Sequence, residues 1–182
     1  MSDRKIITIF GSSRQQEGDA GYARAYELGR ELAKAGFDVC NGGYRGTMEA
    51  AARGARENGG STIGITTTFF PRPANDWIEH EVRMPTMIDR LMKLVEAGDG
   101  YVVLKGGTGT LLEFAAVWEF INKGMLPERP IVVLDDFWDP VIGTLRPELE
   151  WEGIGDCTRF VKQAHSVEEC VEYLQKRLLP GS

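Results

Sequence analysis

The sequence predicts an α/β fold in which a doubly wound parallel sheet carries helices on both faces. Apolar runs of strand length alternate with segments of helical periodicity along the whole chain. Three of the apolar runs end in glycine-containing turns, after Phe10, Cys40 and Leu104. The chain has 182 residues, of which 42% are hydrophobic and 26% charged, so it is long enough for one domain with a sizeable core. We therefore expect residues 1–182 to form a single domain.

Short units of strand and helix make up the first part of the chain. The helix that ends before Gly36 gains a C-cap from that glycine. The segment 66–82 is the longest irregular stretch, and its two prolines, Phe69, Phe70 and Trp77 predict an ordered loop that covers a site. These aromatic side chains could cover a ligand, build a dimer contact or pack in the core. The expected strands are 5–10, 37–40, 62–65, 101–104, 131–134 and 160–161, and the expected helices are 22–35, 47–58, 85–97, 111–122, 138–145 and 167–178.

Composition excludes several classes of protein. The net charge of −6 argues against a nucleic-acid binder, which needs a broad basic face to neutralise phosphates. Cys40, Cys157 and Cys170 are too far apart for a zinc site or a disulfide framework, and His80 and His165 are too separated for a metal site. No apolar run approaches the roughly 20 residues of a membrane span. The first residues lack a signal-peptide pattern, so we expect a cytoplasmic protein without metal or cofactor.

The stretch 104–113 carries the strongest signal in the chain. It joins an expected buried strand to an expected helix, and such a turn directs backbone N–H groups and the positive helix end at one point. This geometry suits a phosphate, although a tight turn that needs positive φ is the structural alternative. The candidate phosphate-binding residues are Gly106, Gly107, Thr108, Gly109 and Thr110. The third glycine of a dinucleotide fingerprint and the Gly-Lys-Ser/Thr of a Walker A motif are missing, which argues against NAD, FAD and P-loop chemistry.

Two further turns belong to the same predicted edge of the sheet. Because ligands bind beyond the carboxyl ends of parallel strands, these turns could complete a nucleotide cradle. Arg45 could meet a phosphate or could be an ordinary surface arginine. The additional candidates are Gly42, Gly43 and Arg45 in the second turn and Gly11, Ser12 and Ser13 in the first.

Glu113 and Arg90 are the candidate catalytic residues. A carboxylate one helical turn beyond a phosphate site would repel the phosphate unless it has another task. Taken singly, Glu113 could merely be stabilised by the helix dipole, and Arg90 could be a solvated helix residue. A Ser-His-Asp hydrolase is not indicated, because Gly11-Ser12-Ser13 is not a GxSxG nucleophile elbow.

Together these motifs resemble the Lonely Guy family, often labelled lysine decarboxylase-like, over about residues 5–145. The family signature PGGxGTxxE corresponds to residues 105–113, and MHxRK corresponds to 87–91, with the same separation between arginine and glycine pair. The element GGGxxGLMG corresponds to the turn that starts at Gly42. Four positions depart from the family pattern: Lys105 replaces proline, Ile88 and Leu91 replace histidine and lysine, and Glu49 replaces glycine.

The resemblance implies a Rossmann-like fold and hydrolysis of a nucleoside 5′-monophosphate to a free base and ribose 5-phosphate. In cytokinin-activating members of the family the base is an N6-modified adenine. It also implies a homodimer with sites near the interface, Glu113 and Arg90 as the catalytic pair, and no cofactor. The alternatives are a binding protein without catalysis, as in the similar molybdenum-cofactor carriers, and a nucleotide sensor. The decarboxylase label finds no support, because Lys105 is the only lysine near the motif.

Overall fold

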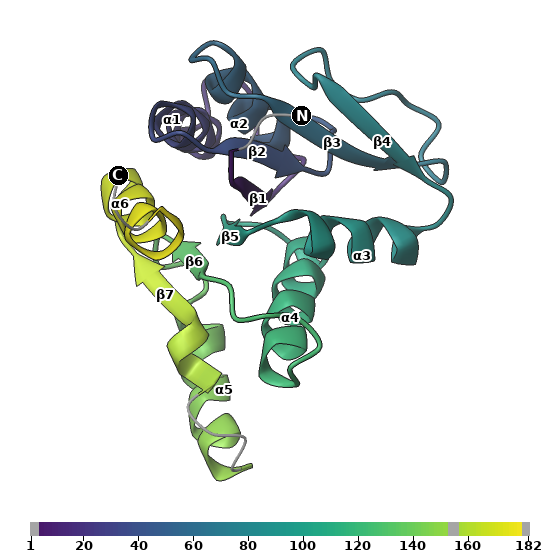
Figure 1. Ribbon diagram of the computed structural model, residues 1–182. Helices are drawn as coiled ribbons and strands as arrows, with labels where there is room; N and C mark the ends of the chain where they lie inside the picture. The colour runs from purple at the N-terminus through teal and green to yellow at the C-terminus, as the bar shows by residue number, and fades with distance from the viewer. Residues whose placement is uncertain (1–3, 153–156, 180–182) are drawn as a thin grey trace.

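One parallel sheet of seven strands organises the described part of the chain (Figure 1). The computed structural model describes residues 4–152 and 157–179. The strand order is β4-β3-β2-β1-β5-β6-β7. The strands are β1 Ile6–Phe10, β2 Asp38–Asn41, β3 Thr62–Thr67, β4 His80–Met84, β5 Gly100–Val103, β6 Ile131–Leu134 and β7 Val161–Ala164. The helices are α1 Ala20–Lys34, α2 Thr47–Arg56, α3 Met87–Ala97, α4 Thr108–Asn122, α5 Asp139–Trp151 and α6 Val167–Leu178, with a 3₁₀ turn at Cys157–Phe160.

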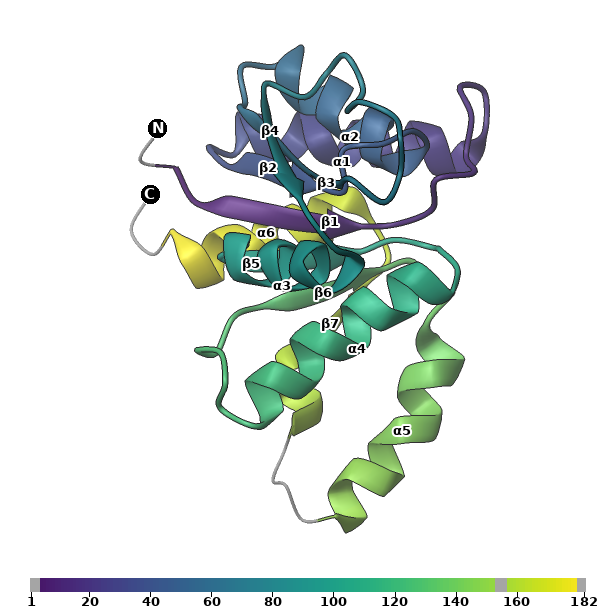
Figure 2. The same cartoon turned by 90° about the vertical axis from the view of Figure 1, so that its right-hand side faces the viewer.

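Helices cover both faces of the sheet, as the sequence predicts (Figures 1 and 2). One hydrophobic core joins α1, α2 and α6 to the sheet, and a second core joins α3, α4 and α5 to its other face. The α/β class and the doubly wound, Rossmann-like arrangement are therefore confirmed. That residues 1–182 form a single nucleotide-binding domain stays a prediction. Within the described ranges, no helix has both the length and the apolar character that a membrane crossing requires.

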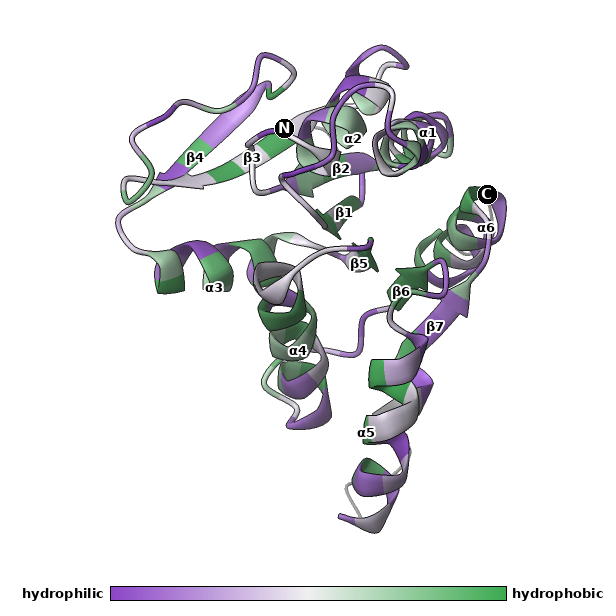
Figure 3. Ribbon diagram, turned by 180° about the vertical axis from the view of Figure 1, so that it is seen from behind, coloured by the Kyte–Doolittle hydropathy of each residue, from purple (hydrophilic) through white to green (hydrophobic). Residues whose placement is uncertain are grey.

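Central strands are apolar on both sides, whereas the edge strand β4 is polar (Figure 3). Residues of β5 and β6 are all buried, as expected for strands that helices cover on both faces. In β4 only Val82 and Met84 pack against the α3 core, and the alternate residues face solvent. The predicted loop 66–82 is therefore wrong at both ends, because β3 continues to Thr67 and β4 starts at His80. Half-exposed edge strands lack the continuous apolar run that reveals a buried strand.

The bounds of five helices also differ from the expected ones, with α1 at Ala20–Lys34 rather than 22–35 and α2 at Thr47–Arg56 rather than 47–58. Helix α3 begins after Pro85, because the Thr86 hydroxyl caps it by accepting from the Asp89 N–H at 3.1 Å. Helix α4 begins at Thr108, three residues before the apolar periodicity starts. Helix α5 continues to Trp151 through Pro147. The last strand is β7, Val161–Ala164, rather than 160–161.

The direction of the chain progression reverses between β1 and β5. Strands β2, β3 and β4 lie on one side of β1, whereas β5, β6 and β7 follow one another on the other side. All seven strands are parallel, so the loops after β1, β2 and β5 meet at one edge. In open α/β sheets the crevice at such a switch point is where ligands bind.

Candidate functional site at the carboxyl edge of the sheet

The three glycine-containing turns follow three adjacent strands, with β1 between β2 and β5. The first two turns are tied directly together, since Ser12 O accepts hydrogen bonds from the Thr47 N–H at 2.9 Å and from Thr47 Oγ1 at 3.1 Å. A Cβ at Gly11 would collide with the Thr47 hydroxyl, and one at Gly46 would collide with Ser12 O. Glycine at these positions therefore lets the first turn lie against the start of α2.

The start of α4, which we call the cradle, has the uncapped geometry that the predicted phosphate site requires. Gly107 is the N-cap, and the first intrahelical hydrogen bond runs from the Leu111 N–H to Gly107 O at 3.0 Å. The N–H groups of residues 108–110 precede this bond and have no helical acceptor. A Cβ at Gly107 or Gly109 would meet open space, so their backbone is accessible to a ligand. Gly106 has a packing role, because its missing Cβ makes room for the Thr110 side chain.

Side-chain caps are present on two helices at the flanks of the sheet and absent from the helices around this cradle. Helices α3 and α6 have side-chain caps, Thr86 and Ser166, whose hydroxyls each accept an N–H at 3.1 Å. Helices α1, α2 and α4, which follow the central strands β1, β2 and β5, have no side-chain cap. Uncapped N-termini leave backbone donors and positive dipole ends available for an anion. Helix α5 also lacks a side-chain cap, but Pro140 in its first turn has no N–H to donate. The uncapped helices at the centre of the edge therefore offer backbone donors for a phosphate.

Arg90 is buried on α3 and is held by two backbone carbonyls. Its Nε donates to Ile65 O at 2.8 Å, and its guanidinium donates to Gly42 O at 3.3 Å. The guanidinium lies 5.6 Å from the centre of the Tyr44 ring. A Cβ at Gly42 would occupy the position of the guanidinium, so that glycine makes room for the arginine. A solvated surface arginine is therefore the wrong interpretation of Arg90.

Glu113 lies opposite Arg90, one helical turn beyond the cradle. Its Oε1 is 3.5 Å from the Arg90 guanidinium. Burial raises the pKa of the Glu113 carboxyl to about 7, and the nearby charge of Arg90 only partly offsets that rise. A carboxyl that titrates near neutral pH can act as an acid or a base. The structure thus brings the two predicted catalytic residues together.

The second turn contributes packing that the sequence analysis did not assign. Gly43 has φ 76°, a conformation that favours glycine, and its N–H donates to the Asn41 side chain at 2.8 Å. Tyr44 was not predicted as a site residue, yet its hydroxyl accepts from the Thr67 N–H at 3.0 Å and its ring faces Arg90. The sequence signal that could have identified Tyr44 is its position between two glycines and an arginine in a predicted ligand-binding turn.

Some predicted residues lie away from the buried pair. Arg45 is exposed and lines a separate pocket of about 490 Å³ together with Arg72 and Trp77. Ser13 is exposed in the first turn, and Ser12 Oγ accepts from the Arg14 N–H at 3.1 Å. Of the loop aromatics, Phe69 is exposed, whereas Phe70 packs edge-on against Tyr44 with ring centres 5.6 Å apart.

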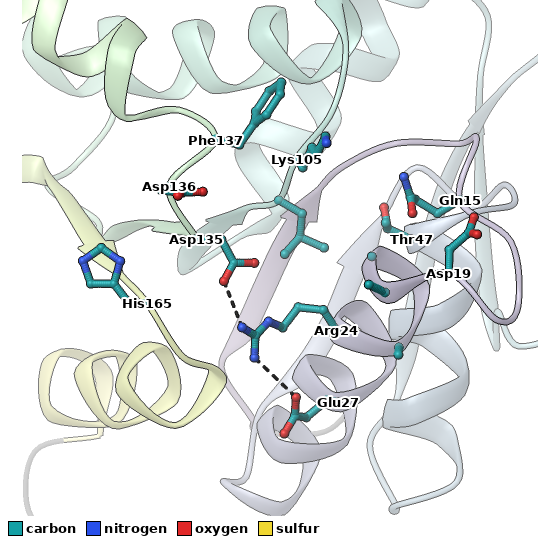
Figure 4. A pocket seen from close by; sticks show the side chains of 14 residues that line it. Gln15, Asp19, Arg24, Glu27, Thr47, Lys105, Asp135, Asp136, Phe137 and His165 are labelled. Carbon is teal, nitrogen blue, oxygen red and sulfur yellow. Dashed lines mark hydrogen bonds and ion pairs between the residues drawn. The ribbon is translucent and has the colours of Figure 1, made fainter.

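A larger pocket of about 1110 Å³ opens at the switch point, on the face of the sheet that carries α1 and α6 (Figure 4). We call it the switch-point pocket. Arg24 from α1 pairs with Asp135 across it at 3.0 Å, and Asp135 follows β6. Its lining includes Arg24, Thr47, Lys105, Asp135, Phe137 and His165. Lys105 lies 5.3 Å from the Phe137 ring centre, at the point where β5 leads into the cradle.

Metal-ligating groups do not gather in the parts of the chain that the structure describes: no group of three or more His, Cys, Asp or Glu residues could hold an ion there. Cys40 and Cys170 are buried free thiols, and burial raises the pKa of each to about 12. The side chain of Cys157 is outside the described ones. Neither buried thiol is prepared for nucleophilic chemistry.

Proteins similar to this chain include cytokinin phosphoribohydrolases and molybdenum cofactor binding proteins. A cytokinin riboside 5′-monophosphate phosphoribohydrolase of Rhodococcoides fascians is 29% identical over 136 residues, which cover 72% of this chain and 68% of that protein. Another of that name, from Oryza sativa subsp. japonica, is 29% identical over 179 residues, or 95% of this chain and 73% of that protein. The molybdenum cofactor binding protein of Rippkaea orientalis matches with a TM-score of 0.75 at 25% identity, covering 98% of this chain and 99% of that one.

The expected resemblance is therefore confirmed at the level of distant similarity to cytokinin phosphoribohydrolases. A family model matches residues 4–149, which include all three turns, Arg90 and Glu113. The chain belongs to the SLOG cluster4 family.

Proposed function

We propose that this protein is a nucleoside 5′-monophosphate phosphoribohydrolase, which cleaves the N-glycosidic bond of AMP or an N6-modified AMP. One observation carries the proposal: a buried glutamate with a pKa of about 7 contacts a fixed arginine, one turn beyond an uncapped helix N-terminus. Similarity to two phosphoribohydrolases at 29% identity supports it.

The cradle at the start of α4 would hold the 5′-phosphate. Backbone N–H groups of residues 108–110 and the hydroxyl of Thr108 supply the donors, and the helix dipole favours the anion. With the phosphate there, the ribose extends toward Glu113 on the next turn. Cleavage of the N-glycosidic bond passes through an oxocarbenium-like ribose, as glycoside hydrolysis does.

Glu113 would act on the ribose carbon from which the base departs. Its carboxylate stabilises the positive charge that develops there and orients the attacking water. Arg90, fixed by Ile65 O and Gly42 O, holds that carboxylate and positions the substrate. A carboxylate close to a phosphate is acceptable in this arrangement, because a cation forms between the two.

Chromatographic detection of free base tests the proposal. Purified protein is incubated with AMP and a panel of N6-modified AMPs, and the same panel is run with Glu113→Gln. We expect release of base by the wild type and loss of release by the variant, while AMP binding persists. Wild-type turnover in Glu113→Gln would overturn the mechanism, and no release from any monophosphate would overturn the function.

A non-catalytic carrier of a nucleotide or of the molybdenum cofactor is the second candidate. The TM-score of 0.75 to a molybdenum cofactor binding protein favours it, as does Lys105, a cation beside the cradle. The same assay separates the two candidates, since measurable nucleotide binding without base release on any substrate supports a carrier.

We also propose a homodimer with the sites near its interface. Apolar side chains next to the buried pair in sequence are exposed, with Ile88 on α3 65% exposed and Leu112 on α4 54% exposed. Exposed apolar surface of this kind marks contact sites. Light scattering after size exclusion tests the dimer, with Ile88→Lys expected to give a monomer. A monomeric wild type would contradict it.

A further inference from the structure

Tyr44 contacts Arg90 and is itself fixed by the end of a neighbouring strand. It lies in the turn after β2 and is only 7% exposed. Its hydroxyl accepts from the Thr67 N–H at 3.0 Å and donates to Thr67 O at 3.4 Å, at the end of β3. Because the backbone of Thr67 uses both hydrogen-bonding functions of the hydroxyl, the ring is held in one orientation.

Hydrogen bonds hold Arg90 only in part. Its Nε lies 2.8 Å from Ile65 O, but Nη2 lies 3.3 Å from Gly42 O and Nη1 lies 3.5 Å from Glu113 Oε1. The last two distances exceed the roughly 2.7–2.9 Å of strong charge-assisted hydrogen bonds. Packing must therefore help to fix the end of the guanidinium that faces Glu113. The Tyr44 ring supplies this packing, since the guanidinium carbon lies over it at 5.6 Å from the ring centre.

The segment 68–79, which we call the β3–β4 loop, packs against the same ring. The Phe70 ring meets the Tyr44 ring edge-on, with an angle of 88° between their planes and 5.6 Å between their centres. The Arg72 guanidinium lies over both rings at 5.5 Å from each centre. Two side chains of the loop thus restrain the tyrosine that contacts Arg90.

Asn75 ties the backbone of this loop to the turn that carries Tyr44. Its side-chain amide donates to Tyr44 O at 2.7 Å and to Gly43 O at 3.1 Å, and its N–H donates to Gly43 O at 2.8 Å. Across the described residues, no hydrogen bond or ion pair joins the loop directly to Arg90 or Glu113. The route from the loop to the buried pair therefore runs through Tyr44.

We propose that Tyr44 is a positioning residue, through which the β3–β4 loop holds the Arg90 guanidinium against Glu113. The loop then restrains the arginine by packing on its aromatic neighbour. The expected effect on catalysis rests on the proposed function, whereas the expected effect on the motion of Arg90 does not.

NMR of protein labelled with ¹³C and ¹⁵N at arginine tests the restraint without any need for turnover. It measures how fast the Arg90 guanidinium rotates about its Nε–Cζ bond. We expect Tyr44→Leu to speed this rotation by about tenfold, because the ring contact is lost, and Tyr44→Phe to keep a rate close to that of the wild type. Tyr22→Leu is the matched control. Tyr22 is also 7% exposed but packs on the α1 face of the sheet, so its replacement should cost stability without changing the Arg90 rate.

Asn75→Ala tests the part played by the loop, and it leaves the buried aromatic ring in place should Tyr44→Leu not fold. It removes the side-chain hydrogen bonds between loop and turn, so we expect Arg90 to rotate at least about twofold faster. Asn58→Ala is its control, because the Asn58 amide also donates to a backbone oxygen, that of Gly54 at 2.9 Å. The control should leave the Arg90 rate unchanged.

Steady-state kinetics test the consequence for catalysis. With the nucleotide that the wild type cleaves best, Tyr44→Leu should lower kcat by about tenfold or more and keep KM within about twofold. KM is expected to hold because the phosphate is bound at the cradle. Tyr44→Phe should recover most of kcat, which a loss of folding alone would not explain in this pattern.

An Arg90 rotation rate that is equal in the wild type and Tyr44→Leu would overturn the inference, as would equal acceleration in Tyr44→Leu and Tyr22→Leu. An unchanged rate in Asn75→Ala would overturn the part assigned to the loop. The two proposals fail separately. Base release together with an Arg90 rate that is independent of Tyr44 leaves the hydrolase and removes the positioning role. An Arg90 rate that depends on Tyr44 in a protein that releases no base leaves the positioning role and removes the hydrolase.

Discussion

Two arginine–carboxylate pairs lie at the carboxyl edge of the sheet, on opposite faces. Arg90 and Glu113 are 3.5 Å apart with side chains 9% and 15% exposed, whereas Arg24 and Asp135 are 3.0 Å apart with side chains 35% and 41% exposed. Although its N–O distance is the longer one, the pair of Arg90 and Glu113 is the one in which burial raises the carboxyl pKa to about 7. Burial, and not the N–O distance, decides which pair can do proton chemistry.

The local fold explains the difference. Arg90 is enclosed by the ends of β2 and β3, and it donates hydrogen bonds to Ile65 O and Gly42 O. Because part of its guanidinium is engaged in this way, it compensates the charge of Glu113 only in part. Arg24 lies on an open helix face and divides its charge between Asp135 and Glu27. Water screens that pair, and its contribution to folding stability is correspondingly small.

The largest expected effect is on catalysis at the buried pair. Glu113→Gln keeps the shape of the side chain but removes its negative charge, so we expect base release to fall by about 10³-fold or more. Initial rates with the most active nucleotide measure it. Glu119→Gln, on the exposed side of the same helix, is the matched control and should stay within about twofold. Equal losses in the two variants would show that helix α4, rather than the carboxylate, was damaged.

The loss of folding stability on replacing the arginine should also differ strongly between the two pairs. Arg90→Met leaves the Glu113 charge buried and the carbonyls of Ile65 and Gly42 without their donor, which we expect to cost about 4 kcal/mol. Arg24→Met should cost at most about 1 kcal/mol, because its pair is exposed. Urea denaturation of both variants gives the comparison. Similar losses would mean that burial does not distinguish the two pairs.

The dependence of stability on pH gives a third test. The pKa of Glu113 rises from an ordinary 4.5 to about 7 on folding, so the folded state binds more protons between these values. The free energy of unfolding should therefore fall as pH rises through this window, by up to about 3 kcal/mol relative to Glu113→Gln. Parallel denaturation curves from about pH 4.5 to pH 8 measure the difference. A flat difference would contradict the raised pKa.

Sequence patterns predicted most of this edge because glycine turns and apolar runs are local signals. Strand β6, Ile131–Leu134, and helix α6, Val167–Leu178, have the predicted bounds. The pairing of Arg90 with Glu113 followed from the family resemblance, since the residues are distant in sequence. The cradle was predicted as a turn, but the structure incorporates Thr108 into α4.

Features that arise from contacts between residues distant in the sequence were not predicted. Strand β4 has only one neighbour and a solvent-facing side, so its residues show no apolar run. Tyr44 gains its role only because the end of β2 lies beside Arg90 and Thr67. The switch-point pocket combines residues from α1, the segment after β6 and the segment after β7, whose spacing along the chain gives no common motif.

The smallest predicted effect concerns the exposed pair. Asp135 is the only non-glycine residue with positive φ in the described ranges, at 67°. Asp135→Gly and Asp135→Ala both remove the ion pair with Arg24, but only glycine also relieves the left-handed backbone. We therefore expect the glycine variant to be more stable than the alanine variant by about 1 kcal/mol, measured by urea denaturation. Since both variants lose the same carboxylate, this difference isolates backbone strain from charge. Equal stability would mean that the left-handed conformation is not strained, and any loss common to both would then measure the exposed pair itself.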